Sequence, residues 1–262
     1  MKANGAEVFW TESRGGVVGG FMNRPSVHNA LDTQLREALA SFWEMVRDSD
    51  EVRVAIIAGA PGASFSSGRD LKETAKAYAS GETGADWELR GRTGYPADDR
   101  PRKPVIAAID GYCMGAGLKI AAECDLRICT PQAVFASPQA KVGRATESPL
   151  YLKRMGLPSA IALDMVFTGL RLDAERALHF GLVSRIVQRE RLMDEAWQMA
   201  GRIAESSPTV IAGLKRGIDA GLAEMPEAIA SPLWRTVTAM YGDTADARAG
   251  ACAFVDKKDA SF

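Results

Sequence analysis

The sequence predicts a mainly parallel α/β fold with a helical C-terminal part, and three observations carry this prediction. The segments 54–59 (VAIIAG) and 104–111 (PVIAAIDG) are almost entirely apolar. A strand without polar alternation is buried on both faces, as in parallel sheets covered by helices. Helical patterns of apolar residues flank these segments, which indicates that strands and helices alternate. From about residue 192 onward, the pattern is helical with only short interruptions.

The first elements are two short strands, expected near residues 8–10 and 17–21, and a turn in NRPSVHNALD. A helix follows, because apolar residues recur at helical spacing. These residues are Leu31, Leu35, Ala38, Phe42, Met45 and Val46. Asp32 is the expected N-cap, since a short acidic side chain accepts hydrogen bonds from the first N–H groups of a helix.

Two further strands are expected later in the chain, a weaker one at residues 126–130 and a short one at residues 186–187. Between the apolar segments 54–59 and 104–111, residues 80–103 are rich in glycine, proline and charge. This composition predicts a surface segment with a short helix around Trp87. Loops of this length are often lids or binding walls. The C-terminal helices break at Ser207 and Pro208. Their first apolar stripe consists of Leu192, Ala196, Met199 and Ile203.

Composition excludes several classes of protein. The formal net charge is −1 and charged residues make up 25% of the chain, so neither nucleic acid nor a membrane surface is an expected partner. No apolar run approaches the roughly 20 residues that cross a bilayer, and MKANGAEVFW lacks the pattern of a secretory signal. The four cysteines show no CxxC spacing and no nearby histidine pair. We therefore expect no metal site and a cytoplasmic protein with reduced, small, buried thiols.

Two glycine-containing turns are the candidate sites of chemistry. The first is SFSSGRDLKE, residues 64–73, where small residues let the backbone approach a ligand. The second is the turn Gly115, Ala116, Gly117, which follows a buried strand ending at Ile109 and precedes a helix. The first N–H groups of a helix suit an anion, or an oxygen that becomes anionic during a reaction. Close packing of strand and helix explains such a turn equally well.

Taken together, these segments resemble the crotonase (enoyl-CoA hydratase/isomerase) superfamily. The segments that carry the resemblance, in the order and spacing of that family, are NRPSVHNAL, SFSSGRDLKE, PRKPVIAAIDGYCMGAGLKIAAECDLRIC, SPQAKVG, RALHFGLVSRIV and FVDKKDASF. The resemblance implies a spiral of ββα units over residues 1–195 and a helical region, residues 196–262, that forms homotrimers or dimers of trimers. It also implies acyl-CoA substrates, as in fatty acid metabolism, without a separate cofactor, because coenzyme A is part of the substrate.

The resemblance assigns two main-chain N–H groups, those of Arg69 and Ala116, to an oxyanion hole for the thioester oxygen. Two preorganised donors stabilise an enolate as its charge forms, and losing one such donor costs about 3 kcal/mol. Lys257 and Lys258 are either ligands of the phosphates of coenzyme A or an ordinary solvated tail. The remaining implied substrate-binding positions are Ser64, Phe65, Gly68, Asp70, Leu71 and Gly115.

The sequence departs from the family at its acids. Family hydratases use two glutamates, and the matching positions here hold Lys119 and Gln139, which cannot replace a pair of carboxylates. Glu147, after Thr146, matches the catalytic glutamate of some enoyl-CoA isomerases, which need only one base. Its alternative is a solvated glutamate at a helix start. Lys119 pairs with Glu147, pairs with Glu123 one helical turn away, or points to solvent; a tuning role is favoured for it and for Gln139.

Three functions remain open. The leading one is an enoyl-CoA isomerase with Glu147 as the base. The second is another acyl-CoA reaction: hydration with atypical acids, C–C cleavage or decarboxylation. The third is a non-catalytic acyl-CoA-binding protein. The two histidines, His28 and His179, are expected to be surface or packing residues, and no histidine partner is visible for the serines of residues 66–67.

Overall fold

The computed structural model describes residues 7–81, 101–143, 152, 155–221, 226–242, 244–260 and 262. Within these ranges, no helix combines the length and the apolar character that crossing a membrane requires. Most of the predicted surface segment, including Trp87, lies outside the described residues, and so does Glu147.

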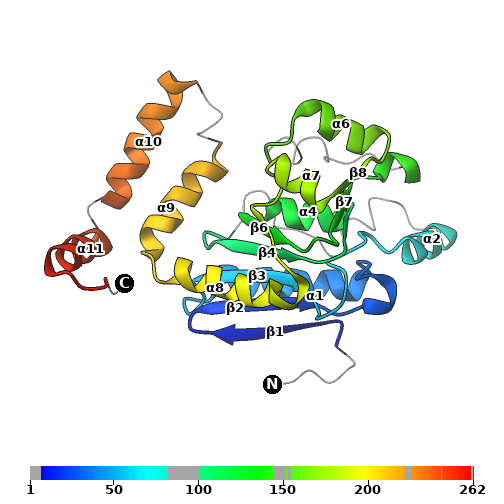
Figure 1. The fold of residues 1–262 in the computed structure, drawn as a ribbon, viewed down its shortest axis with the longest axis horizontal. Helices are drawn as coiled ribbons and strands as arrows, with labels where there is room; N and C mark the ends of the chain where they lie inside the picture. The colour runs from blue at the N-terminus through cyan, green and yellow to red at the C-terminus, as the bar shows by residue number, and fades with distance from the viewer. Residues whose placement is uncertain are drawn as a thin grey trace.

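Two sheets form the core of the molecule (Figure 1). The larger has the order β1-β2-β3-β4-β6-β9, with β1 antiparallel to β2 and every later neighbour parallel. Its strands are β1 Phe9–Arg14, β2 Val17–Met22, β3 Val54–Gly59, β4 Val105–Ile109, β6 Leu126–Cys129 and β9 Arg185–Ile186. The smaller sheet consists of β5 Tyr112–Met114, β7 Val134–Ala136 and β8 Arg171–Asp173. The predicted parallel α/β architecture is confirmed.

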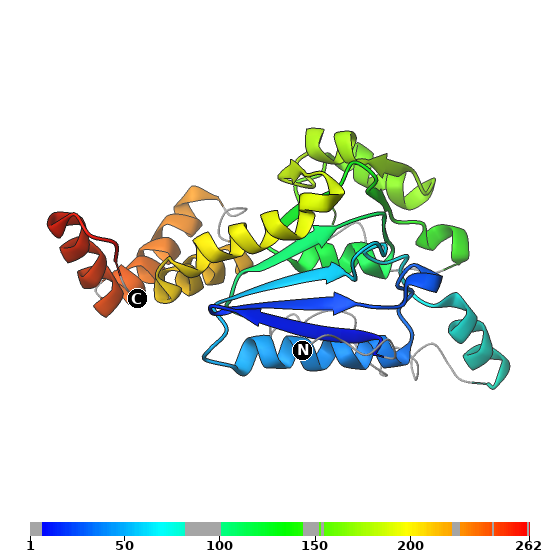
Figure 2. The same cartoon turned by 60° about the horizontal axis from the view of Figure 1, so that its bottom comes forward.

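The central strand β3 is buried on both faces, as its unbroken apolar sequence predicts. Ala55 and Ile57 point into one core cluster together with the apolar face of α1, Thr33–Asp48. Val54 and Ile56 point into a second cluster with α8, Leu192–Ala204. Figure 2 shows α1 and α8 on opposite sides of the sheet. Because successive side chains of a strand alternate between faces, the two faces of β3 contribute to two different core clusters, each covered by one of these helices.

The predicted start of α1 and the predicted break before α9 are also confirmed. Asp32 Oδ1 accepts a hydrogen bond of 2.9 Å from the Leu35 N–H at the N-terminus of α1. Ser207 Oγ accepts one of 3.1 Å from the Val210 N–H, and Pro208 occupies the first position of α9, Pro208–Asp219. Proline fits this position because the first N–H of a helix has no partner inside the helix.

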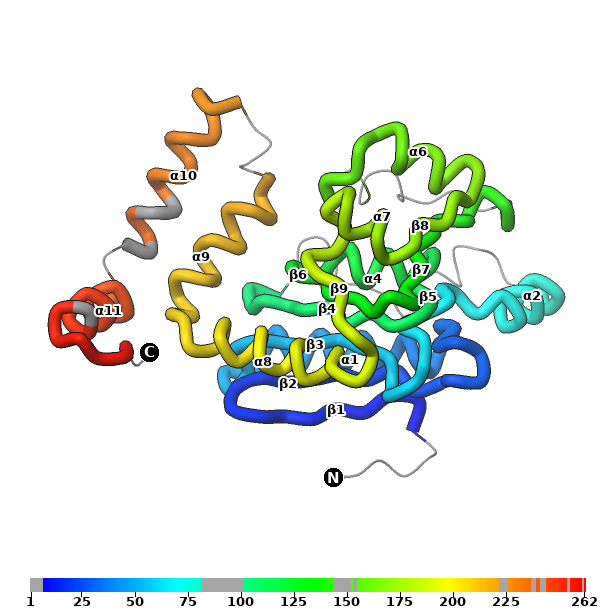
Figure 3. Tube along the Cα trace, in the orientation of Figure 1, coloured from blue at the N-terminus to red at the C-terminus, as the bar shows by residue number. Residues whose placement is uncertain are grey.

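The C-terminal extension consists of α9, α10 (Glu227–Gly242) and α11 (Ala245–Asp256), which stand to one side of the sheets (Figures 1 and 3). The predicted boundary between residues 195 and 196 falls inside α8, which packs on the sheet, and the division of the chain into two domains stays a prediction. The extension begins after α8. It is anchored by Lys215, whose Nζ lies 2.7 Å from Asp125 Oδ2 and donates to the Lys103 carbonyl at 2.8 Å.

Candidate active site

The first glycine-containing turn runs beside the short strand β5. The Phe65 N–H donates to the Asp110 carbonyl, and the Ser66 N–H to the Tyr112 carbonyl, both at 2.7 Å. The Met114 N–H donates back to the Ser66 carbonyl at 2.9 Å. These bonds fix the backbone of the turn against the strand that leads into the second turn. The three-residue β5 was not predicted, because three residues are too few to show a period.

The second turn consists of Gly115 alone, since α4 (Ala116–Glu123) begins two residues earlier than predicted. Gly115 caps α4 with φ 52°, a conformation that favours glycine, although a Cβ there would meet nothing within 4 Å. Ala116 is the first helical residue, so its N–H has no acceptor within the helix. Gly117 has a different reason: a Cβ on it would lie 2.7 Å from the Ser66 carbonyl oxygen. Close packing therefore explains Gly117, and backbone conformation explains Gly115.

Gly68 brings the two turns into contact. A Cβ on Gly68, which has φ 94°, would lie 2.8 Å from the Met114 carbonyl oxygen and 3.3 Å from the Ala116 nitrogen. Only a residue without a side chain allows the first turn to approach the start of α4 this closely. The residues on either side of Arg69 are both bonded to Leu31.

Leu31 makes one main-chain hydrogen bond on each side of Arg69. The Leu31 N–H donates to the Gly68 carbonyl at 2.8 Å, and the Asp70 N–H donates to the Leu31 carbonyl at 3.2 Å. Leu31 and Arg69 thus form a parallel bridge. In a parallel bridge, the central residue of one strand directs its own N–H away from its partner. The Arg69 N–H therefore faces away from Leu31. Its convergence with the Ala116 N–H on one oxygen stays a prediction.

The positions of the family's two glutamates hold side chains that already have polar partners. Lys119 Nζ lies 2.6 Å from Glu123 Oε1 on the same helix, which is one of the three arrangements expected for this lysine. Gln139 begins a short 3-10 helix, Gln139–Val142, and its Oε1 accepts a hydrogen bond of 2.7 Å from Ser137 Oγ. Glu123 is thus a carboxylate next to Lys119 that sequence reasoning treated only as a possible partner.

The predicted substrate-binding residues of the first turn have different environments. The Phe65 side chain is fully buried in the core, so it supports the turn and offers no binding surface. Leu71 is half exposed at the start of α2, Leu71–Ala79. Ser64 Oγ lies 3.4 Å from Nδ1 of the exposed His28, whose ring contacts Tyr112 edge-on. Ser64 and Leu71 therefore keep part of their surface accessible, whereas Phe65 does not.

The serines at positions 66 and 67 donate to main-chain carbonyls, those of Asn29 at 2.8 Å and Val27 at 3.3 Å. Both hydroxyls therefore hold the turn in place. This agrees with the sequence, which shows no histidine partner that would make either serine a nucleophile. His179 ends α7, Ala174–His179, with its ring against Phe180, as expected of a packing residue.

Asp70 caps α2, and its surroundings lower the pKa of its carboxyl. Its Oδ1 accepts from the N–H groups of Lys72 at 3.1 Å and Glu73 at 3.3 Å, and its Oδ2 lies 3.2 Å from Arg24 Nη1. Burial alone would raise the pKa of the Asp70 carboxyl, but the Glu73 N–H, the Arg24 guanidinium and the Lys72 N–H outweigh it and lower this pKa below its ordinary value. Both oxygens of this carboxylate therefore have structural partners, and a role of Asp70 in substrate binding stays a prediction.

Within one chain, Lys257 and Lys258 lie far from the two glycine-containing turns. They follow α11, at the far end of the extension from α4 (Figures 1 and 2). Lys258 Nζ lies 3.7 Å from Asp256 Oδ2, and both side chains are exposed. In the single chain these lysines are solvated, and their role in binding the phosphates of coenzyme A stays a prediction.

The cysteines confirm the expected buried thiols with one exception. Cys113, Cys124 and Cys129 are buried, and burial raises the pKa of Cys124 to about 12. Cys252 is exposed, against expectation. In the part of the chain that the structure describes, no cluster of histidine, cysteine and carboxylate side chains could hold a metal ion.

Comparison with known proteins gives consistent results at the level of sequence and of structure. The family described as enoyl-CoA hydratase/isomerase matches residues 12–262. A carnitinyl-CoA dehydratase of Citrobacter koseri is 39% identical over 207 residues, which cover 78% of this chain and 77% of the relative. A carnitinyl-CoA dehydratase of Salmonella enteritidis is 40% identical over the same shares.

Two solved structures extend the likeness to nearly the whole chain. An enoyl-CoA hydratase/isomerase from Mycobacterium paratuberculosis superposes with a TM-score of 0.86 at 28% identity, covering 97% of this chain and 98% of the other. DspI of Pseudomonas aeruginosa gives a TM-score of 0.86 at 29% identity, covering 99% and 98%.

Proposed function

The chain belongs to the enoyl-CoA hydratase/isomerase family and has its crotonase fold, and from this premise we propose that it isomerises an enoyl-CoA through a thioester enolate. The Arg69 and Ala116 N–H groups hold the thioester oxygen. Glu147 removes a proton from C2 of a 3-enoyl-CoA and returns it at C4, which moves the double bond to the 2 position. Because the same proton is returned, one base suffices.

The observation that carries this proposal is the chemistry at the two positions of the family's glutamates. Lys119 is a cation paired with Glu123, and Gln139 is an amide bonded to Ser137. Adding or removing water needs one group that activates water and another that delivers a proton. Neither Lys119 nor Gln139 has a carboxylate that could perform one of these two functions. Enolate formation in an oxyanion hole makes no such demand.

The proposal is tested by replacing Glu147 with glutamine. We expect Glu147→Gln to lower turnover of a 3-enoyl-CoA by about 10²- to 10⁴-fold, the usual contribution of a general base. Binding of a saturated acyl-CoA should be retained, because the hole is built from main-chain groups. Glu44→Gln, on the exposed face of α1, is the matched control and should leave turnover unchanged. Full activity of Glu147→Gln would show that the base is a different residue.

A second candidate function is the removal of water from an acyl-CoA such as carnitinyl-CoA. It is favoured by the identity of about two residues in five with the two carnitinyl-CoA dehydratases. A panel of CoA thioesters followed by mass spectrometry separates the candidates. Dehydration lowers the mass by one water, whereas isomerisation leaves the mass unchanged and moves the double bond. Binding without any turnover across the panel would instead indicate a non-catalytic acyl-CoA-binding protein.

A further inference from the structure

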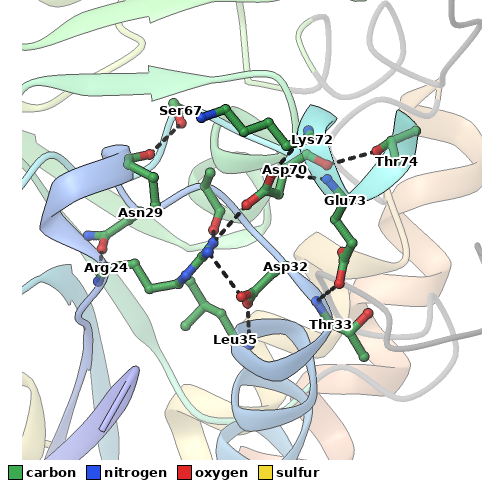
Figure 4. Close-up of polar contacts among 12 residues, drawn as sticks. Arg24, Asn29, Asp32, Thr33, Leu35, Ser67, Asp70, Lys72, Glu73 and Thr74 are labelled. Atoms are coloured by element: carbon green, nitrogen blue, oxygen red, sulfur yellow. Dashed lines mark hydrogen bonds and ion pairs between the residues drawn. The ribbon is translucent and has the colours of Figure 1, made fainter. Parts of the chain in front are cut away.

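Arg24 links two segments that are far apart in the sequence and that meet beside the first turn (Figure 4). Its Nη2 lies 3.1 Å from Asp32 Oδ2, and its Nη1 lies 3.2 Å from Asp70 Oδ2. The same Nη1 donates to the Ala30 carbonyl. One guanidinium therefore holds the residues before and after Leu31 together with Asp70. A planar fork of donors suits such a multiple contact, whereas a lysine offers a single point of charge.

Both carboxylates that Arg24 contacts cap a helix with their other oxygen. Asp32 Oδ1 caps α1 through the Leu35 N–H, and Asp70 Oδ1 caps α2 through the Lys72 and Glu73 N–H groups. Arg24 thus fixes the orientation of two helix starts relative to each other. The side chains of Arg24, Asp32 and Asp70 are only 19%, 20% and 13% exposed. Water screens this cluster less than it screens a surface ion pair.

Arg69 lies in the middle of this arrangement. Leu31 bonds Gly68 and Asp70 on either side of it, and Arg24 in turn holds both neighbours of Leu31 and the Asp70 carboxylate. The direction of the Arg69 N–H therefore depends on one clamp made of Leu31 and Arg24. Arg24 itself is not among the residues that the family resemblance assigns to binding or catalysis.

A second link between the two helices is independent of Arg24. The Thr33 N–H donates to Glu73 Oε1 at 3.0 Å, and Arg36 Nη2 lies 3.6 Å from Glu73 Oε2. Because this link remains, removing the Arg24 contacts leaves α1 and α2 docked. We therefore expect an Arg24 substitution to act on the local backbone around Leu31 and around residues 68–70 rather than on the docking of the two helices.

We propose that Arg24 is a positioning residue that aims the Arg69 N–H at the thioester oxygen. This inference rests on one part of the proposed function, the oxyanion hole. It does not depend on which residue is the base. A misplacement of 1 Å caused by a distant mutation lowers the rate by about 10²-fold. Losing the Arg24 fork should therefore weaken stabilisation of the enolate while ground-state binding of the thioester stays intact.

The experiment measures the enolate directly and needs no turnover. Acetoacetyl-CoA ionises at C2 to an enolate that absorbs ultraviolet light, and an oxyanion hole favours the ionised form of the bound ligand. The fraction of bound enolate is titrated against pH for the wild type, Arg24→Lys and Asp70→Asn. Lysine keeps the positive charge, and asparagine keeps the helix cap. Arg185→Gln, which breaks an ion pair with Glu195 away from the turns, is the control.

We expect the wild type and Arg185→Gln to favour the bound enolate strongly. Arg24→Lys and Asp70→Asn should each reduce the enolate-to-ketone ratio by about 10- to 100-fold, with unchanged affinity for butyryl-CoA. Equal ratios in the wild type and both variants would refute the role of Arg24 and leave the hole intact. Absence of any enolate enrichment in the wild type would refute the hole itself, and the role of Arg24 with it. Equal losses of butyryl-CoA affinity and enolate ratio would show a merely structural role.

Discussion

At the scale of single residues, the site depends on positions where a side chain is forbidden rather than required. Gly68 lets one turn touch the start of α4, and Gly115 adopts a conformation that favours glycine. Both glycines could be located from the sequence, because two short glycine motifs follow apolar strands. The sequence could not show why each glycine is needed, since the contact between residues 68 and 116 depends on tertiary packing. Arg24 was missed for the same reason: its partners lie up to 46 positions away.

Substituting Gly68 with alanine tests the close approach of the turns. Gly68 and Gly62 both have positive φ, at 94° and 80°, but only at Gly68 would a Cβ meet the backbone. Backbone strain of this kind costs about 1–3 kcal/mol. We expect Gly62→Ala to show this loss alone in urea unfolding. Gly68→Ala should lose more stability and also lower the enolate ratio of bound acetoacetyl-CoA. Equal effects of the two substitutions would contradict the contact.

At the scale of elements, periodicity predicted the long helices and the buried strands but not the short pieces. The apolar run of β3 and the stripe of α8 were read correctly because burial on defined faces leaves a pattern. The strands β5, β7 and β8 have three residues each, and a pattern of three positions cannot be distinguished from chance. The start of α2 was also unpredicted, although its cap, Asp70, was singled out for binding. A capping carboxylate and a ligand-binding one look alike in sequence.

The cap of α2 predicts a pH-dependent contribution to stability. The pKa of Asp70 is lowered from 3.8 in the folded chain, so the carboxylate stabilises the fold above that value, and this stabilisation disappears as pH falls through the lower, folded-state pKa. Asp70→Asn removes the charge and keeps the cap. The stability difference between wild type and variant should therefore be largest near neutral pH and shrink in acid. Thermal unfolding from pH 7 to pH 2 measures it.

The matched control for this prediction is Asp173→Asn. Asp173 caps α7 through the Arg176 N–H at 2.8 Å, so its substitution shows what replacing a capping aspartate does by itself. A stability difference at Asp70 that stays constant across the acid range would contradict the role of its charge.

At the scale of the whole molecule, the α/β core could be predicted and the border of the extension could not. Both parts contain amphipathic helices, and only the packing of α8 on β3 and β4 assigns it to the core. Beyond that border, the extension carries large exposed apolar side chains, including Leu214 at 51% and Ile218 at 60%. Such a concentration of apolar surface is typical of an interface. We therefore expect α9 and α10 to form the interface of the homotrimers or dimers of trimers that the family resemblance implies.

A charge on the extension tests this assembly. Ile218→Asp should shift the protein toward monomers in sedimentation velocity, because burying an unpaired carboxylate in an apolar interface is costly. Phe167→Asp is the control: Phe167 is 69% exposed on α6, Ser159–Phe167, which belongs to the core. It should leave the sedimentation coefficient unchanged. If the wild type sediments as a monomer, or if both variants behave alike, the extension is not the interface.

The ion pair between Lys215 and Asp125 makes the extension more than a detachable appendage. Asp125 directly follows the C-cap of α4, and its Oδ2 also accepts the N–H of Val105 at the start of β4. Trimming the protein after α8 would keep every strand of both sheets, yet it would remove the cation that pairs with that carboxylate at the C-terminal end of α4, the helix that begins at Ala116. A shortened version would therefore be a poor stand-in for the intact enzyme in any kinetic comparison.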